Sequence, residues 1–167
     1  MKGRHHYATQ LQWTGNIGAG TRAYGAYERS FVILGDGKPA IQGSSDPAFR
    51  GDSSRYNPEE MLLAALASCH MLMYLHLCAK AGVVVEAYSD RAQGSMSEDG
   101  KGGGRFTQVL LRPRVHISDP SMGNKAMALH KRANALCYLA NSVNFEVLHE
   151  PQVRFGPGGS GRDTLED

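Results

Sequence analysis

Residues 57–81 read NPEEMLLAALASCHMLMYLHLCAKA, and this stretch decides the fold because it carries the signals of one long helix. Asn57 is a favourable N-cap and Pro58 suits the first helical position. Glu59 and Glu60 place negative charge at the positive end of the helix dipole, and Glu60 also stands where the acidic partner of a capping box belongs. The pattern predicts a helix from 58 to 81, about 35 Å long.

The apolar run from Met61 to Ala79 is close to the roughly 20 residues that a bilayer span requires. It nevertheless contains His70 and His76, and it ends at Lys80. Strand-like segments flank it on both sides. We therefore expect the buried helix of a globular protein and no membrane partner.

The segments around this helix are predicted strands and one further helix. Strand-like patterns cover 5–14, 23–34, 83–96, 105–117 and 143–147, with shorter segments near 40–41 and 153–155. Gly35-Asp36-Gly37 supplies the chemistry of a hairpin turn. A second helix is expected from Asp119-Pro120 to about Ala140, because apolar residues recur there at the helical period. The order of elements predicts one α+β domain over 1–155 and a disordered tail over 156–167.

Composition narrows the class of protein. The chain has 167 residues, a formal net charge of +2 and three cysteines. This length suits one domain with its own core, and the small, mixed charge gives no basic stripe for nucleic acid. Three sparse cysteines do not make the framework of a secreted disulfide-rich protein, so a reducing, cytoplasmic compartment is expected.

Two of the cysteines lie on the apolar faces of the two predicted helices, Cys69 on the first and Cys137 on the second. Such thiols are either small packing residues, or a peroxide-reactive cysteine with its resolving partner. The second interpretation needs a thiolate, because a neutral thiol is a poor nucleophile. Cys78 has no partner of this kind and is expected to be a packing residue.

The run Asn57-Pro58-Glu59-Glu60, followed by an Ala/Leu-rich stretch to Ser68-Cys69-His70, resembles the active-site helix of the OsmC/Ohr family of hydroperoxide-reducing proteins. The segment from Lys131 through Cys137 to Val143 is similar to the second-cysteine helix of that family. The resemblance implies an OsmC-like, intertwined homodimer in which antiparallel sheets wrap around two long helices. It assigns Cys69 as the peroxidatic cysteine, Cys137 as the resolving cysteine and Glu59 as an acidic catalytic residue.

The resemblance also implies a reaction. An antioxidant, stress-response enzyme of this kind would reduce organic hydroperoxides to alcohols through a Cys69 sulfenic acid and a Cys69–Cys137 disulfide. An external dithiol, for which a lipoyl-type group is one candidate, would restore the thiols. The chemistry requires no metal or prosthetic group, so no cofactor is expected. The apolar residues expected to bind the substrate, and to favour alkyl or fatty-acid hydroperoxides, are Phe49, Tyr56, Leu66 and Met73.

In this family an arginine stabilises the thiolate and holds the peroxide. Arg50 lies one residue from the position that this arginine takes in the OsmC branch, and it is the expected counterpart. Arg55, expected to bind substrate, and Arg22 are the alternatives. Tyr138 follows Cys137 where many relatives carry proline, which is a departure from the family pattern at the resolving cysteine.

The spacing of Glu59 and Cys69 bears on the oligomeric state. Ten residues on one helix separate the two backbones by about 15 Å along the axis and about 80° around it. One glutamate side chain cannot span that distance. If both residues serve one site, Glu59 must come from the other subunit, across two antiparallel helices that meet near the small residues Ala64 and Ala65.

Two further interpretations remain open. Metal binding would use His70, His76, Cys78 and His130, but the sequence has no Cys-x-x-Cys or His-Glu-x-x-His spacing. Alternatively, the chain is a non-catalytic OsmC-like dimer that binds a small apolar ligand. Counting thiols after one equivalent of hydroperoxide separates this binder from a peroxidase, which would lose two thiols.

Overall fold

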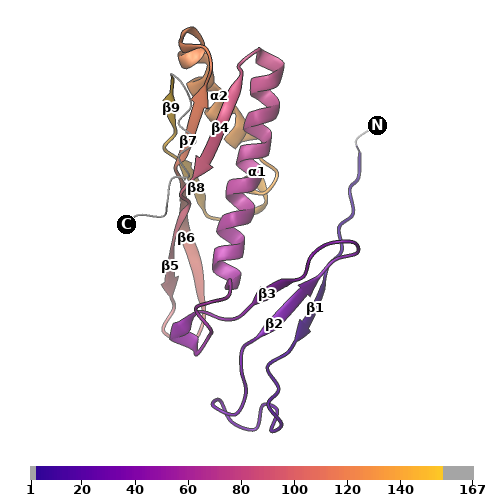
Figure 1. Cartoon of the computed structure of the whole chain (residues 1–167). Helices are drawn as coiled ribbons and strands as arrows, with labels where there is room; N and C mark the ends of the chain where they lie inside the picture. Colours follow the sequence, from indigo (N-terminus) through magenta and orange to yellow (C-terminus); the bar gives the residue numbers. More distant parts are fainter. Residues whose placement is uncertain (1–2, 156–167) are drawn as a thin grey trace. The chain divides into compact units, whose positions relative to one another are not determined.

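A computed structural model describes residues 3–155 of the chain. The chain forms two compact units, Met1–Leu62 and Leu63–Asp167, whose elements Figure 1 colours along the sequence. The tail predicted over 156–167 lies outside the described residues, and the single domain over 1–155 stays a prediction.

Unit 1 is built on a three-stranded antiparallel sheet of order β1-β2-β3. The strands are β1 (Gln10–Trp13), β2 (Phe31–Leu34) and β3 (Ile41–Gly43), and a short 3-10 helix, η1 (Pro47–Phe49), follows them. The predicted turn joins β2 to β3, where the N–H of Lys38 donates to the carbonyl of Gly35 at 3.1 Å and Gly37 has a φ of 68°. Every residue of β1 is exposed.

The predicted strands over 5–14 and 23–34 were too long. Residues 23–27 form turns and bends and residues 28–30 have no regular structure; the guanidinium of Arg29 holds this segment together. Arg29 donates to the carbonyls of Tyr27 at 2.6 Å and Tyr24 at 2.7 Å, and it lies 4.3 Å from the centre of each tyrosine ring. The strand-like pattern of the sequence does not show these cation–π contacts, so the second strand was predicted to start too early.

The long helix α1 (Pro58–Ala81) has the predicted bounds. Its capping box is confirmed: the N–H of Glu60 donates to Asn57 Oδ1 at 2.8 Å, and the N–H of Asn57 donates to Glu60 Oε2 at 3.0 Å. Gly82 follows the helix with a φ of 73°, the left-handed conformation that ends many helices.

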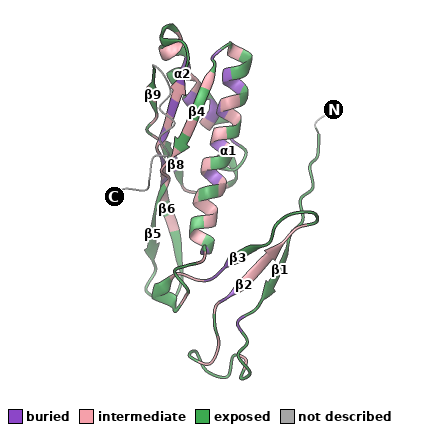
Figure 2. Ribbon diagram, in the orientation of Figure 1, coloured by how far each residue is buried: buried purple, intermediate pink, exposed green. Residues whose placement is uncertain are grey.

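Burial of α1 within one chain is less complete than expected. The helix is long and apolar enough to cross a membrane, a test that the core helix of a soluble protein also passes. Only 28% of its most apolar 18-residue window is buried, and Figure 2 shows exposed and half-buried positions along much of its length. Within a single chain, α1 is therefore not buried on all sides.

Unit 2 contains two three-stranded sheets of order β4-β7-β9 and β5-β6-β8. The strands are β4 (Val85–Asp90), β5 (Gln93–Glu98), β6 (Gly104–Leu111), β7 (Pro113–Ile117), β8 (Glu146–His149) and β9 (Gln152–Arg154). The expectation of antiparallel sheets is wrong in part, because β6 pairs with β8, and β7 with β9, in parallel.

The two long strands predicted over 83–96 and 105–117 are each divided between the two sheets. At the division, the N–H of Arg112 leaves the strand ladder and donates to Asp90 Oδ1 at 2.7 Å. Pro113, which has no N–H to offer, follows. The side chain of Arg112 also bonds Gln93, and Glu150 at 3.2 Å. The alternating pattern runs through this point, so the sequence alone does not reveal the division.

The second helix is shorter than predicted. A 3-10 turn, η2 (Pro120–Met122), leads into α2 (Gly123–Leu136), and a further 3-10 turn, η3 (Ala140–Ser142), follows. Cys137 is the C-cap and has an extended ψ of 116°, so it ends the helix instead of lying within it. The extension to Ala140 was wrong because apolar spacing continues past the point where the backbone turns.

The core of unit 2 lies between α1, β7 and α2. Its buried members are Tyr74, Leu77, Cys78, Val83, Val115, Ile117, Ala126 and Ala133. Lys125, near the start of α2, donates to the carbonyl of Ala81 at the end of α1 at 2.7 Å. Because Cys137 at the other end of α2 contacts Cys69 further back in α1, the two helices run in opposite directions.

Candidate functional site

Two cysteine side chains distant in the sequence meet in unit 2. The side chain of Cys137, which is buried, lies close enough to that of Cys69, which is half-buried on α1, for the two thiols to interact. The turn after α2 sets this geometry: Cys137 receives the N–H of Asn141 at 3.1 Å on its carbonyl and donates its own N–H to Asn134 at 3.2 Å. The structure thus brings together the two residues expected to be peroxidatic and resolving, while their roles stay a prediction.

The environment of Cys137 keeps its thiol protonated. Burial, and then the neighbouring Cys69 side chain, raise the pKa of Cys137 to about 11, although the backbone N–H groups of Ala140 and Leu139 act in the opposite direction. At neutral pH Cys137 is therefore an S–H donor. Cys69 is the more exposed of the two side chains. The arrangement favours Cys69 as the sulfur that meets a reactant first.

Cys78 does not take part in this contact. It is buried in the core of unit 2, and burial raises the pKa of its thiol. Its side-chain partner is Tyr74, one turn earlier on α1. This placement agrees with the packing role that the sequence suggested.

A pair of buried histidines, both named from the sequence as candidate metal ligands, lies next to the cysteines. His70 follows Cys69 on α1, and its Nε2 lies 3.1 Å from Nδ1 of His130 on α2. Both side chains are fully buried. Burial lowers the pKa of His70 to about 4 and that of His130 to about 3, so both rings are neutral at pH 7. The signal in the sequence was one polar residue on the inward face of each helix.

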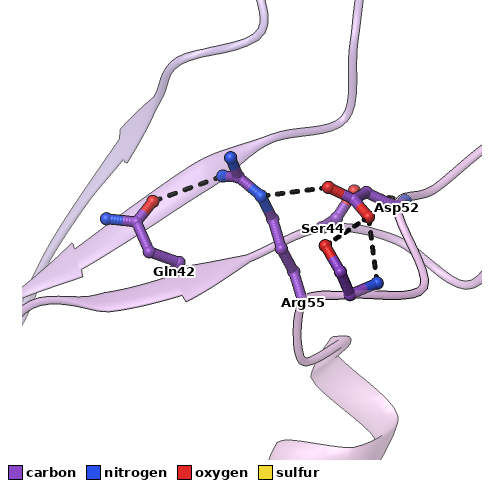
Figure 3. A network of polar contacts seen from close by, with 5 residues as sticks. Gln42, Ser44, Asp52 and Arg55 are labelled. Carbon is purple, nitrogen blue, oxygen red and sulfur yellow. Dashed lines mark hydrogen bonds and ion pairs between the residues drawn. The ribbon is translucent and has the colours of Figure 1, made fainter.

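The arginines expected to act on the substrate lie in unit 1, around a hollow of about 290 Å³. Arg55 is held between two side chains in Figure 3: it donates to Gln42 Oε1 at 3.2 Å and pairs with Asp52 Oδ2 at 3.2 Å. Hydrogen bonds from Ser54, with a smaller contribution from Arg55, lower the pKa of Asp52. The lining residues are Glu28, Arg29, Ser30, Ser44, Arg50, Gly51, Asp52 and Arg55.

Arg50 is the one described non-glycine residue with a positive φ, at 66°. It caps η1 in the left-handed conformation, and its backbone N–H donates to the carbonyl of Pro47. Its guanidinium lies 6.0 Å from the ring of Tyr24. A residue other than glycine in this conformation carries backbone strain, and such strain is concentrated at functional sites.

The remaining predicted site residues are distributed over both units. Glu59 is half-buried in the first turn of α1, and Phe49 and Tyr56 are exposed in unit 1. In unit 2, Leu66 is buried and Met73 packs against the core. Substrate binding by these residues stays a prediction.

Metal chemistry finds no support in the part of the chain that the structure describes. Over residues 3–155, no group of three or more histidine, cysteine, aspartate or glutamate side chains is arranged to hold a metal ion. The histidines of the sequence-based metal interpretation are placed differently. His70 and His130 bond one another, and His76 is exposed.

A long helix carrying one cysteine, a shorter antiparallel helix ending in another, and small sheets against them define a class of α+β protein with paired thiols. The family model described as OsmC-like protein matches residues 51–150. The chain belongs to this OsmC/Ohr family.

Similar proteins cover most of the chain. The uncharacterized protein YmaD of Bacillus subtilis is 26% identical over 157 residues, which are 91% of this chain and 97% of that protein. The solved structure of an OsmC-like protein of unknown function from Vibrio cholerae is 31% identical with a TM-score of 0.77, covering 89% of this chain and all of that one. The organic hydroperoxide resistance protein OsmC of Legionella pneumophila is 20% identical with a TM-score of 0.64, covering 90% and 98%. The likeness to the Legionella structure, at this low identity, is evidence of a shared fold alone.

Proposed function

We propose that the chain is a thiol-dependent peroxidase that reduces organic hydroperoxides to alcohols. The observation that carries this proposal is the contact between the Cys69 and Cys137 side chains, with the proton held on Cys137. Membership of a family that includes organic hydroperoxide resistance proteins supports it. The three thiols, all free, suit the reducing cytoplasm as the place of action.

The proposed cycle balances with one hydroperoxide and one dithiol. The Cys69 thiolate attacks the outer oxygen, the O–O bond breaks, and the alkoxide leaves and is protonated to the alcohol. Cys137 then gives up its proton to the leaving hydroxyl as its sulfur attacks the Cys69 sulfenic acid, which forms the disulfide and releases water. An external dithiol, such as a lipoyl-type group, supplies two electrons and two protons by thiol–disulfide exchange. No step needs a metal or a prosthetic group.

Arg50 is proposed to hold the peroxide and stabilise the thiolate, with Arg55 contacting the substrate. Support comes from their convergence on one hollow and from the strained backbone of Arg50. The apolar side chains proposed to bind substrate, Phe49 and Tyr56 in unit 1 and Leu66 and Met73 in unit 2, would favour an organic over an inorganic peroxide.

We propose that the working form is a homodimer with a shared site, in which sheets wrap around the central helices. Large apolar side chains are exposed on the single chain, including Leu11, Ile41 and Leu72 at 68%, 48% and 63%. Exposed apolar area of this extent is typical of a surface that another chain covers. The spacing of Glu59 and Cys69 on α1 gives a second argument, since one glutamate cannot reach along ten residues of helix.

Mixing variants tests the shared site. A Cys69→Ser chain and a Glu59→Gln chain are each expected to be inactive. Their heterodimer combines an intact Cys69 with an intact Glu59 from the other chain, so activity should return at one of its two sites. Activity that does not return in the mixed dimer would place both residues in the same subunit. A Glu59→Gln chain that is active by itself would give Glu59 no role.

Thiol counting tests the peroxidase itself. After one equivalent of cumene hydroperoxide, the reduced protein should lose two thiols, and peptide mapping should find Cys69 joined to Cys137 with Cys78 still free. A dithiol should restore both thiols. Retention of all three thiols would instead indicate the non-catalytic relative that binds a small apolar ligand.

A further inference from the structure

The His70–His130 pair joins α1 to α2 directly beside the cysteines. The two ring nitrogens lie 3.1 Å apart, and the rings are almost parallel, with an interplanar angle of 5° and centroids 5.4 Å apart. His70 adjoins Cys69 in the same turn of α1. His130 precedes Cys137 by two helical turns and therefore lies on the same side of α2.

Neighbouring rings fix the pair in place. Tyr74 stacks on His130 with centroids 3.8 Å apart, and His149 of β8 lies 5.7 Å from His70. Beyond Tyr74 lie Tyr88 of β4, with centroids 6.1 Å apart, and Cys78. Among the described residues these are the titratable groups packed around the pair, and none of them carries charge at neutral pH. Burial raises the pKa of both tyrosines and of Cys78, and it lowers the pKa of His149.

The hydrogen bond exists only while the pair shares one proton between its facing nitrogens. One ring must donate and the other must accept, so the facing nitrogens cannot both be protonated. The second nitrogen of each ring, Nδ1 of His70 and Nε2 of His130, is buried without a protein partner. The shared hydrogen bond is therefore the polar contact that the two rings have with protein, and a shift of α1 along α2 would break it.

We propose that the His70–His130 hydrogen bond is a positioning device for the cysteine pair: it fixes α1 against α2 so that the Cys137 thiol meets Cys69. The inference rests on the proposed function in taking these sulfurs as the working pair. Disulfide bonds require Cβ atoms about 4 Å apart, so a shift of one residue along either helix would separate the sulfurs too far. The bond between Lys125 and Ala81 restrains the opposite end of the helix pair, so these two polar contacts hold α1 and α2 together at separate points.

Matched substitutions separate positioning from general stability. His70→Leu removes the hydrogen bond, and His70→Asn is too short to make it. His70→Gln carries an amide near the position of Nε2, and His130→Asn carries one near Nδ1, so both can keep the bond. Val115→Ala is the control, because it removes volume from the same core at a buried residue of β7.

Equilibration of the full chain with mixtures of oxidised and reduced dithiothreitol measures how well the two thiols are placed. In this exchange the protein forms its disulfide, and the reagent gains the two electrons and two protons. Wild type should form the Cys69–Cys137 disulfide. His70→Leu and His70→Asn should lower the equilibrium constant about tenfold, the effect that loss of one buried hydrogen bond has on an equilibrium. His70→Gln, His130→Asn and Val115→Ala should stay within about threefold of wild type.

Each outcome decides the inference. A wild-type protein that forms no disulfide in the oxidised mixtures would overturn it, as would His70→Asn behaving like His70→Gln. If His70→Leu fails to fold, the comparison of asparagine with glutamine at position 70 still gives the answer. If the disulfide forms as expected but hydroperoxide is not reduced, the positioning role stands and the proposed peroxidase fails.

Discussion

Asn57 and Glu60 exchange two hydrogen bonds, of 2.8 Å and 3.0 Å, at the first turn of the helix that carries Cys69. Glu60→Ala removes one of them and should lower the free energy of unfolding by about 1 kcal/mol. Urea unfolding at a fixed protein concentration measures the change.

Glu59→Ala is the control, because it leaves the cap intact and should cost only a few tenths of a kcal/mol. Peroxidase activity should show the reverse order, with Glu59→Ala the more damaging. Equal losses of stability in the two variants would contradict the cap.

Arg50→Gly should separate strain from function. Glycine adopts the left-handed conformation at position 50 freely, whereas arginine there costs about 1 kcal/mol. The variant should therefore unfold at equal or higher urea concentration, while its rate of hydroperoxide reduction falls at least tenfold. Arg4→Gly, at an exposed position outside the candidate arginines, is the activity control. Full activity of Arg50→Gly would exclude Arg50 as the residue that holds the peroxide.

Cys137→Ala should change the product of oxidation without blocking the first step. Cys69 would still form a sulfenic acid, but no second thiol would capture it, so excess hydroperoxide would carry it on to sulfinic acid. Mass spectrometry of the intact chain detects this as the addition of two oxygens. Cys78→Ala should instead still form the Cys69–Cys137 disulfide, with two thiols oxidised for each hydroperoxide reduced. A disulfide between Cys69 and Cys78 in the Cys137→Ala protein would show that the resolving role is not specific to Cys137.

The buried histidines make stability depend on pH. The pKa values of His70 and His130 in the fold, about 4 and about 3, lie below the ordinary value of 6.5. The unfolded chain therefore binds more protons below pH 6.5, and the folded form loses stability as the pH falls from there towards 4. Each ring contributes up to about 1.4 kcal/mol per pH unit. Urea unfolding at pH 7 and pH 5 should differ by about 2 kcal/mol or more.

His130→Asn removes one of these titrations and is the matched variant for the pH experiment. Its stability should change less between pH 7 and pH 5 than that of wild type, even if it is less stable at both. A wild-type protein equally stable at both values would mean that the rings are not buried as neutral imidazoles.

The sequence predicted those elements that end with strong local signals. α1 was predicted at its true bounds because a capping box starts it and Gly82 stops it. α2 was predicted too long because apolar spacing continues through Cys137, where the backbone becomes extended and the helix ends. The division of the long strands depends on Asp90 receiving the N–H of Arg112 from another strand. Contacts between distant segments leave no mark on local periodicity.

Part of the candidate site could likewise be predicted from the sequence, and part could not. Cys69 and Cys137 could be selected from their helices and from the family resemblance, and the structure brings their side chains into contact. The histidine pair could not be predicted, because nothing local connects His70 with a residue sixty positions away. A histidine on an apolar helix face suggests a ligand or a packed ring equally well. The parallel strand pairs were missed for a similar reason, since the hydrogen-bond direction of a short strand depends on its neighbour.

The end of α2 at Cys137 has a thermodynamic consequence for turnover. A covalent bond from there to Cys69 would close a ring of roughly 70 residues that encloses β4 to β7 and α2. Closing a ring of that size restricts the unfolded chain by about 4 kcal/mol in the chain-entropy account. The oxidised protein would thus resist heat and proteases better than the reduced one, so each catalytic round would begin from the more fragile of its two redox forms.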